Sequence, residues 1–136
     1  MIISADEFAR LRTSEKPDEY LRAANDEATL SIWKEIISGF PEMRTWVAHN
    51  KTVPIDILEI LARDESIAVR AAVADKRKLT VELFELLVQD CSELVRLRIA
   101  HNRKLPIHLL KQLLDDPSPL VVATAEERLG HRERVG

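Results

Sequence analysis

Hydrophobic positions recur in this chain with a constant offset of 26 residues between Met43 and Leu120. Val47, Val73 and Ile99 each precede an alanine and then a polar residue. A constant offset of this kind is typical of proteins that stack one structural repeat. The predicted repeats cover residues 43–68, 69–94 and 95–120, with a partial fourth from residue 121.

Each repeat is predicted to contain two short helices. Val69 and Val73 lie four positions apart, on one helical face. After a polar loop, a second apolar stripe follows with i, i+1, i+4 spacing, as in Ile57, Leu58 and Leu61. Pro54, Thr80 and Pro106 stand at equivalent positions at the start of this second helix, and proline suits the first turn of a helix. Because so short a helix pair cannot bury its stripe alone, the pattern favours a stack of pairs.

The two ends of the chain depart from the repeat. In residues 1–42, Ser4 and Glu7 form a capping box for a first helix, Pro17 opens a second, and residues 28–37 form a third. We expect these residues to be an N-terminal helical cap. Near the other end, Glu126 replaces the alanine of the earlier repeats and Gly130 is expected to stop the helix. Residues 121–136 are therefore predicted to be a C-terminal capping repeat and tail.

The repeat motif has a recognisable form. It consists of Asp64 followed by Val69-Arg70-x-x-Val73-Ala74, of Asp90 followed by Val95-Arg96-x-x-Ile99-Ala100-x-Asn102, and of the segments 54–58 and 106–110. Over residues 43–125 this resembles the leucine-rich repeat variant (LRV) family, a relative of HEAT repeats. The period is slightly longer than the family's, and Lys76 and Thr80 replace the asparagine and proline of the motif. The resemblance implies an α-solenoid that serves as a binding scaffold.

The expected fold class is therefore all-α. We predict a single domain over residues 1–136, a short right-handed α-solenoid of about three 26-residue two-helix repeats with an N-terminal helical cap.

Composition argues against several kinds of chemistry. The net charge is −3, whereas general nucleic-acid binders are more often basic. Cys91 is the single cysteine, which excludes an internal disulfide or a cysteine zinc site, and three glycines cannot build a phosphate loop. His49 and His101 stand two repeats apart, too far to share a metal ion. We predict no enzyme, no cofactor and no metal site.

Neither a secretion signal nor an apolar run long enough to span a membrane is visible in the sequence. We therefore expect a cytoplasmic protein.

Candidate protein-binding residues lie on the helices that line the inner surface in HEAT-like stacks: Trp46, His49, Arg70, Ala72, Asp75, Arg96, Arg98 and His101. Trp46 has no apolar equivalent in the other repeats, so it either anchors an interface or packs under the cap against Phe40. The recurring arginines either face an anionic partner or form a structural ladder, in which Asp64 and Asp90 serve the helices that carry Arg70 and Arg96.

A second candidate surface consists of basic residues in equivalent loops: Lys51, Lys76, Arg77, Lys78, Arg103 and Lys104. The loops at the opposite helix ends carry acidic residues. The basic loops are open to three interpretations: a phosphate-backbone site, a site for an acidic protein, or a solvated edge.

The function predicted is a non-catalytic protein-binding repeat scaffold, an adaptor or inhibitor of a partner protein. A narrower hypothesis is an immunity protein that neutralises a bacterial toxin, with the acidic edge blocking a basic nuclease. The alternative is a nucleic-acid-binding solenoid that uses the basic loops. No membrane or small-molecule partner is expected.

Overall fold

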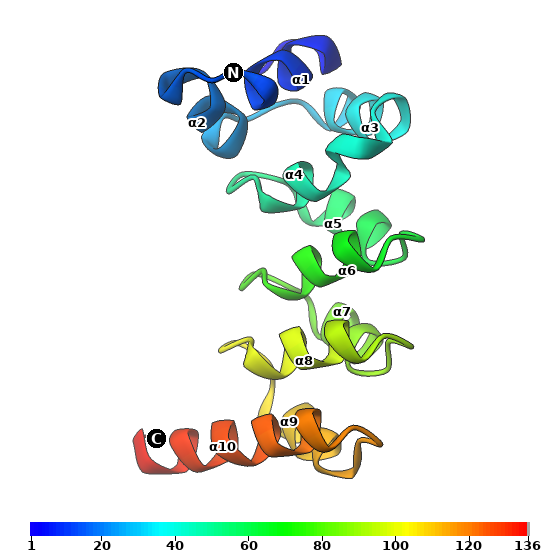
Figure 1. The fold of residues 1–136 in the computed structure, drawn as a ribbon, viewed down its shortest axis with the longest axis vertical. Coiled ribbons are helices and arrows are strands. Elements are labelled where there is room, and N and C mark those ends of the chain that lie inside the picture. Colours follow the sequence, from blue (N-terminus) through cyan, green and yellow to red (C-terminus); the bar gives the residue numbers. More distant parts are fainter. Residues whose placement is uncertain (136) are drawn as a thin grey trace. The chain divides into compact units, whose positions relative to one another are not determined.

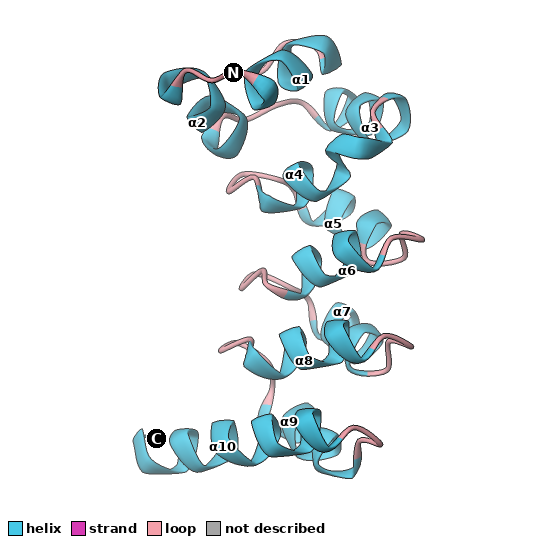
Figure 2. Ribbon diagram, viewed as in Figure 1, coloured by secondary structure: helices cyan, strands magenta, loops and turns pink. Residues whose placement is uncertain are grey.

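The computed structural model describes residues 1–135, with side chains to residue 134, and over this range the chain is helical and contains no strand (Figures 1 and 2). The all-α prediction is confirmed. The α-helices are α1 (Ala5–Thr13), α2 (Pro17–Asn25), α3 (Leu30–Gly39), α4 (Arg44–His49), α5 (Ile55–Leu61), α6 (Ile67–Ala74), α7 (Val81–Val88), α8 (Glu93–His101), α9 (Ile107–Gln112) and α10 (Pro119–Val135). Short 3-10 turns, η1 (Pro41–Met43) and η2 (Leu113–Asp115), precede α4 and follow α9.

The chain divides into two compact units, Met1–Asp64 (unit 1) and Glu65–Gly136 (unit 2). Unit 1 contains α1 to α5, and unit 2 contains α6 to α10. The boundary falls in the turn before α6, inside the first predicted repeat. The prediction of a single domain divided after residues 42 and 120 stays a prediction.

The first three helices begin where their capping residues allow. Ser4 Oγ accepts a hydrogen bond from the Glu7 amide at 3.0 Å, and Glu7 Oε1 accepts one from the Ile3 amide at 3.2 Å. The serine half of the predicted capping box therefore forms, whereas the glutamate accepts from Ile3, the residue before the cap, and not from the Ser4 amide. Pro17 is the first residue of α2, as expected. Helix α3 begins at Leu30, two residues later than predicted, because the Thr29 side chain caps the Ile32 amide.

Each predicted repeat between residues 43 and 120 contains two α-helices. Pro54 and Pro106 occupy the N-cap positions of α5 and α9. Thr80, which replaces proline before α7, instead accepts a hydrogen bond from the Leu83 amide at 3.2 Å. The departure from the repeat motif therefore keeps the helix start and changes only the group that stabilises it.

The core of unit 1 lies between the cap helices and the first helix pair. Phe8 of α1 and Trp33 of α3 are fully buried and meet edge to face, with ring centroids 5.8 Å apart. Helix α1 packs on α2 and α3, and α3 in turn contacts α4 and α5. Residues 1–42 thus supply the apolar surface that covers the first helix pair inside this unit.

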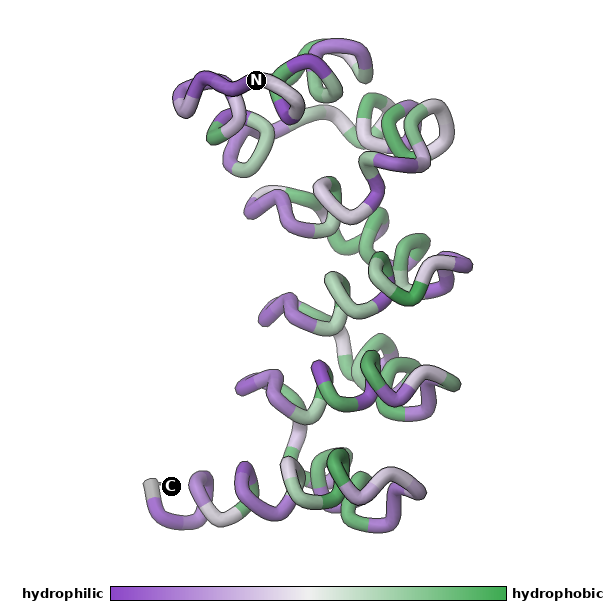
Figure 3. The backbone as a smooth tube through the Cα atoms, viewed as in Figure 1, coloured by the Kyte–Doolittle hydropathy of each residue, from purple (hydrophilic) through white to green (hydrophobic). Residues whose placement is uncertain are grey.

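In unit 2, alternate helices along the chain pack against one another. Helices α6, α8 and α10 contact one another in succession, while α7 contacts α8 and α9 (Figure 1). Apolar residues at equivalent positions are buried, for example Val73 and Ile99, and Leu87 and Leu113. The loops after α6 and α8 are hydrophilic (Figure 3). Within unit 2, these apolar residues are therefore buried between neighbouring helices.

Gly130 does not end the last helix, and the sequence-based prediction was wrong at this point. Helix α10 continues through Gly130 to Val135. The reason is tertiary, because Arg132, beyond the glycine, donates hydrogen bonds to the carbonyl groups of Asn102, Arg103 and Leu105. These contacts hold the last turns of α10 against the loop after α8.

A buried asparagine joins neighbouring helix ends in each unit. Asn102 donates from Nδ2 to the carbonyl oxygens of Ala74 and Lys76, at 2.8 and 2.6 Å, and accepts from the Lys104 amide. Asn50 makes the same contacts with Ala23 and Asp26. In unit 1 the cap helix α2 therefore provides the carbonyl groups that α6 provides in unit 2.

Asn102→Ala is expected to lower the free energy of unfolding by about 2–3 kcal/mol, because it leaves buried carbonyl groups without donors. Urea unfolding followed by circular dichroism measures this change. Asn25→Ala is the matched control, since Asn25 is exposed and donates only to Leu21 within its own helix; a change within about 0.5 kcal/mol is expected there. Equal losses in the two variants would contradict the structural role of Asn102.

Candidate functional surfaces

Three arginines at equivalent positions form ion pairs with the aspartate 20 residues later in the chain. In unit 1 the pair is Arg44 with Asp64, at 3.1 Å. In unit 2, Arg70 pairs with Asp90 at 2.9 Å and Arg96 with Asp116 at 2.8 Å. The arginine ladder therefore exists, but its register differs from the prediction, because the Asp90 carboxylate binds Arg70 and not Arg96.

Each ladder arginine also binds a backbone carbonyl at the preceding turn. Arg96 Nη1 donates to the Asp90 carbonyl at 2.7 Å, and Arg44 Nε donates to the Ile37 carbonyl at 2.7 Å. The side chains of Arg96 and Asp116 are only 13% and 4% exposed. Arg70 and Arg96 are thus committed to contacts inside the protein, which favours the structural interpretation over the predicted contact with a partner.

The prediction that Ala72 contacts a partner was wrong. Its side chain is buried, as are those of Ala71, Val73 and Ala74 on the same helix. Because these side chains of α6 are small, neighbouring segments pack close to the helix. The second half of α6 is therefore almost entirely shielded from solvent. Beyond its end, Asp75 is exposed and pairs with exposed Arg98 of α8 at 2.6 Å. His101 is exposed at the end of α8.

Trp46 is partly exposed and also packs against a residue of the N-terminal helices. Its side chain is 40% exposed, and the Arg12 guanidinium carbon lies 3.4 Å from the ring centroid. His49, one turn later, tilts toward the ring with centroids 5.9 Å apart. The cap residue that packs on Trp46 is therefore Arg12, whereas we expected Phe40. A stacked guanidinium holds the indole in place without covering it.

Trp46 lines a mainly apolar hollow of about 170 Å³ in unit 1. We call this the Trp46 hollow; its lining residues are Arg12, Tyr20, Leu21, Ala23, Ala24, Trp46 and His49. Leu21 is 51% exposed, and Tyr20 beside it is also exposed. Sequence reasoning missed the residues from α1 and α2, because they lie outside the repeat. The available signal was the pair Tyr20-Leu21 on a short helix whose one buried residue is Ala23.

The basic loops of unit 2 lie together at one edge. Asn102 binds the carbonyl of Lys76, which holds the loop after α8 against the loop after α6. Arg77, Lys78, Arg103 and Lys104 are exposed there. Lys76 is half-buried, and burial lowers the pKa of its ammonium group. Lys51, also exposed, belongs to unit 1.

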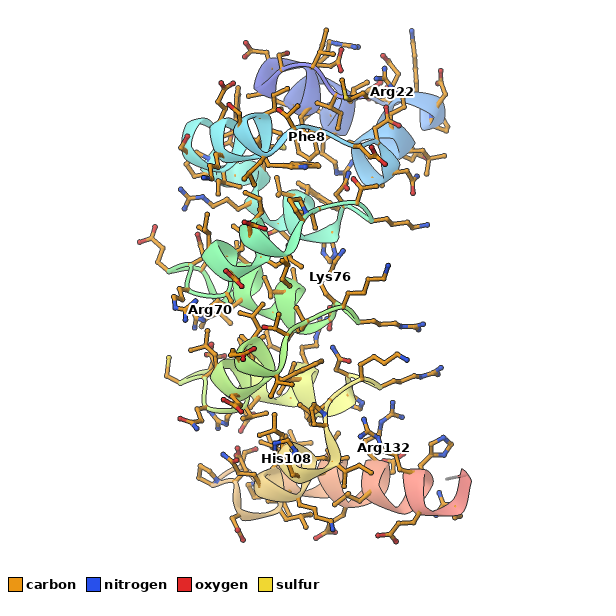
Figure 4. All side chains as sticks on the ribbon, turned by 180° about the vertical axis from the view of Figure 1, so that it is seen from behind. Phe8, Arg22, Arg70, Lys76, His108 and Arg132 are labelled. Atoms are coloured by element: carbon orange, nitrogen blue, oxygen red, sulfur yellow. The ribbon has the colours of Figure 1, made fainter. Side chains whose placement is uncertain are left out.

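A second hollow, of about 360 Å³, lies at the C-terminal end of this edge. We call it the basic hollow; the described residues that line it are Arg103, Arg128, His131 and Arg132. Burial and the neighbouring Arg128 both lower the pKa of Arg132. Figure 4 shows Lys76 and Arg132 toward one edge of unit 2 and Arg70 at the other. Two of the four lining residues, His131 and Arg132, lie beyond Gly130, where the sequence predicted the helix to end.

The two kinds of ion pair are expected to differ in energy. A double-mutant cycle on Arg96→Ala and Asp116→Ala should give a coupling of about 1–3 kcal/mol, because this pair is shielded from solvent. The same cycle on exposed Arg98 and Asp75 should give about 0–1 kcal/mol. Urea unfolding of the single and double variants measures both coupling energies. Equal couplings would show that the shielded ladder pair stabilises the fold no more than the exposed pair does.

Within residues 1–135, no three His, Cys, Asp or Glu side chains gather closely enough to hold a metal ion. No helix of the described part is long and apolar enough to cross a membrane. No protein-family model matches the chain, and no curated protein or solved structure matches it. The Trp46 hollow, the basic hollow and the charged loops are the features of the molecule that bear on function.

Proposed function

We propose that the protein is a non-catalytic, protein-binding scaffold of the cytoplasm, an adaptor or inhibitor that holds its partner at the Trp46 hollow. In this proposal the helix pairs form a short right-handed α-solenoid, and residues 1–42 cap its N-terminal end. The observation that carries the proposal is an exposed tryptophan held beside an apolar hollow by a stacked arginine.

The composition of the hollow favours a protein partner. Trp, Tyr and Arg are the residues most enriched at the energetic centres of protein interfaces. Here Trp46, Tyr20 and Arg12 lie around one depression, with exposed Leu21 beside them. A depression of this size admits an apolar side chain from a partner. Because Arg12 already orients the indole, binding costs little additional ordering of side chains.

Arg12 also indicates the chemistry of the partner. Among the residues that the structure describes, no carboxylate pairs with Arg12, and its contact is the Trp46 ring. The edge of its guanidinium thus keeps hydrogen-bond donors for a carboxylate. The proposed partner presents an aromatic or aliphatic side chain next to an aspartate or glutamate.

The narrower hypothesis of an immunity protein receives less support from the structure. It relied on an acidic edge that blocks a basic nuclease, but Asp64, Asp90 and Asp116 are committed to the arginine ladder. Exposed acidic residues at these turns are Glu65, Glu93 and Asp115. Ionic attraction to a toxin would therefore depend on fewer charges than the sequence indicates.

The test is affinity capture from lysate of the native host, with wild-type protein and the Trp46→Ala variant. A partner held at near-unit stoichiometry by the wild type should bind the variant at least about tenfold more weakly, the loss expected for a central interface residue. Ile60→Ala is the matched control, because Ile60 is 47% exposed in the same unit but does not line the hollow.

Tryptophan fluorescence gives an independent measurement with the captured partner. Trp33 is buried and Trp46 is exposed, so partner binding should shift only the Trp46 emission to shorter wavelength and protect it from acrylamide. The Trp46→Phe variant supplies the Trp33 background. Partner binding that leaves Trp46 open to acrylamide, or equal losses in Trp46→Ala and Ile60→Ala, would reject this hollow as the interface.

A further inference from the structure

We infer that unit 2 binds the phosphate backbone of a double-stranded nucleic acid along the basic hollow and the two loops beside it. This surface shares no residue with the Trp46 hollow, so the inference does not depend on the proposed function. It also extends the basic loops recognised in the sequence by Arg128, His131 and Arg132, which only the structure brings beside them.

Hydrogen bonds place three cationic segments in succession. Asn102 donates to the carbonyl of Lys76, which joins the loop after α6 to the loop after α8. Arg132 donates to the carbonyls of Arg103 and Leu105, which joins that second loop to the last turns of α10. Packed helices lie about 8–10 Å apart, so the charges form a row and not a single point. A row of this kind suits a polyanion with regularly spaced charges.

The basic hollow is suited to a phosphate group. Each of its four lining side chains carries nitrogen, and no carboxylate is among the described residues that line it. Arg128 is positioned by a hydrogen bond to the His101 carbonyl at 3.2 Å. Arg132 is anchored to backbone oxygens, and burial together with the nearby charge of Arg128 lowers its pKa. An anion between these groups would relieve that repulsion and accept several charge-assisted hydrogen bonds.

The acidic side chain beside the first loop does not cancel the row. Asp75, at the start of the first loop, is engaged by Arg98 at 2.6 Å. Arg77, Lys78, Arg103 and Lys104 are exposed, and these four form no ion pair within the described part of unit 2. Their charges therefore remain available to a ligand.

The absence of aromatic side chains at this surface favours a double-stranded over a single-stranded nucleic acid. Phe84 is the one aromatic residue in residues 65–135, and it is buried. Single strands are usually held by bases stacked on aromatic side chains, whereas a duplex can be held by cationic side chains through its phosphate backbone alone. The cores of protein interfaces are apolar and aromatic, unlike the lining of this hollow. The surface therefore fits a duplex, bound without regard to base sequence.

Fluorescence anisotropy with short labelled DNA and RNA duplexes tests the inference. The wild type should bind at least one duplex at about 50 mM salt, and the affinity should fall steeply toward about 200 mM. Arg103→Glu/Lys104→Glu should lower the affinity at least about tenfold at the lower salt concentration. It should also make the plot of log K against log salt shallower by about two, since each lost phosphate contact removes about 0.9 counterion.

The matched control is Arg63→Glu/Lys111→Glu, which changes the net charge equally at exposed positions outside the row. Its affinity should stay within about twofold of the wild type, because screening limits the reach of distant charges. Circular dichroism melts establish that both variants fold. The inference is overturned if neither duplex binds at the lower salt concentration, if the two double variants lose affinity equally, or if poly-glutamate competes as well as unlabelled duplex, which would indicate an acidic protein.

Discussion

Short helices leave many backbone carbonyl groups without an intrahelical partner, and the structure depends on side chains that supply donors to them. An α-helix lacks partners for its last four carbonyl groups, a large share of a helix such as α4, with six residues. Asn50 and Asn102 bind such carbonyls at the ends of α2 and α6. Arg132 does the same for the loop after α8. Without these donors, the helix ends would be buried at a cost that packing could hardly offset.

The need for donors to backbone carbonyl groups also separates the cationic residues into a shielded class and an exposed class. Arginines of the ladder, such as Arg96, bind a carbonyl on one side and an aspartate on the other, and are shielded from solvent. Cations in the loops, such as Arg77 and Arg103, lie at the opposite helix ends and are exposed. A net charge of −3 hides this division. The ladder is therefore a structural element, whereas the cations at the basic edge of unit 2 remain exposed.

The two candidate surfaces arise where the repeat ends. The Trp46 hollow forms because α1 and α2 replace the helix pair that an earlier repeat would provide, and they bring Arg12 and Tyr20 to Trp46. The basic hollow forms because α10 runs past Gly130 and carries His131 and Arg132, beside Arg128, to the loop after α8. Inside the repeat, equivalent positions such as Val73 and Ile99 are occupied by similar buried residues, which serve packing. Irregular ends offer surfaces that no internal repeat has.

The sequence by itself determined the helical class, the paired short helices and most of their starting points. These follow from local rules, namely the spacing of apolar residues and the side chains of Ser4, Pro17 and Thr80, which act within one turn of the chain. Tertiary structure alone decided the register of the arginine ladder, the burial of Ala72 and the length of α10. Each of these depends on which residues far apart in the chain face one another. Periodicity specifies that a helix has an inner face, but only the packed neighbours specify which carboxylate or carbonyl lies across from a given side chain.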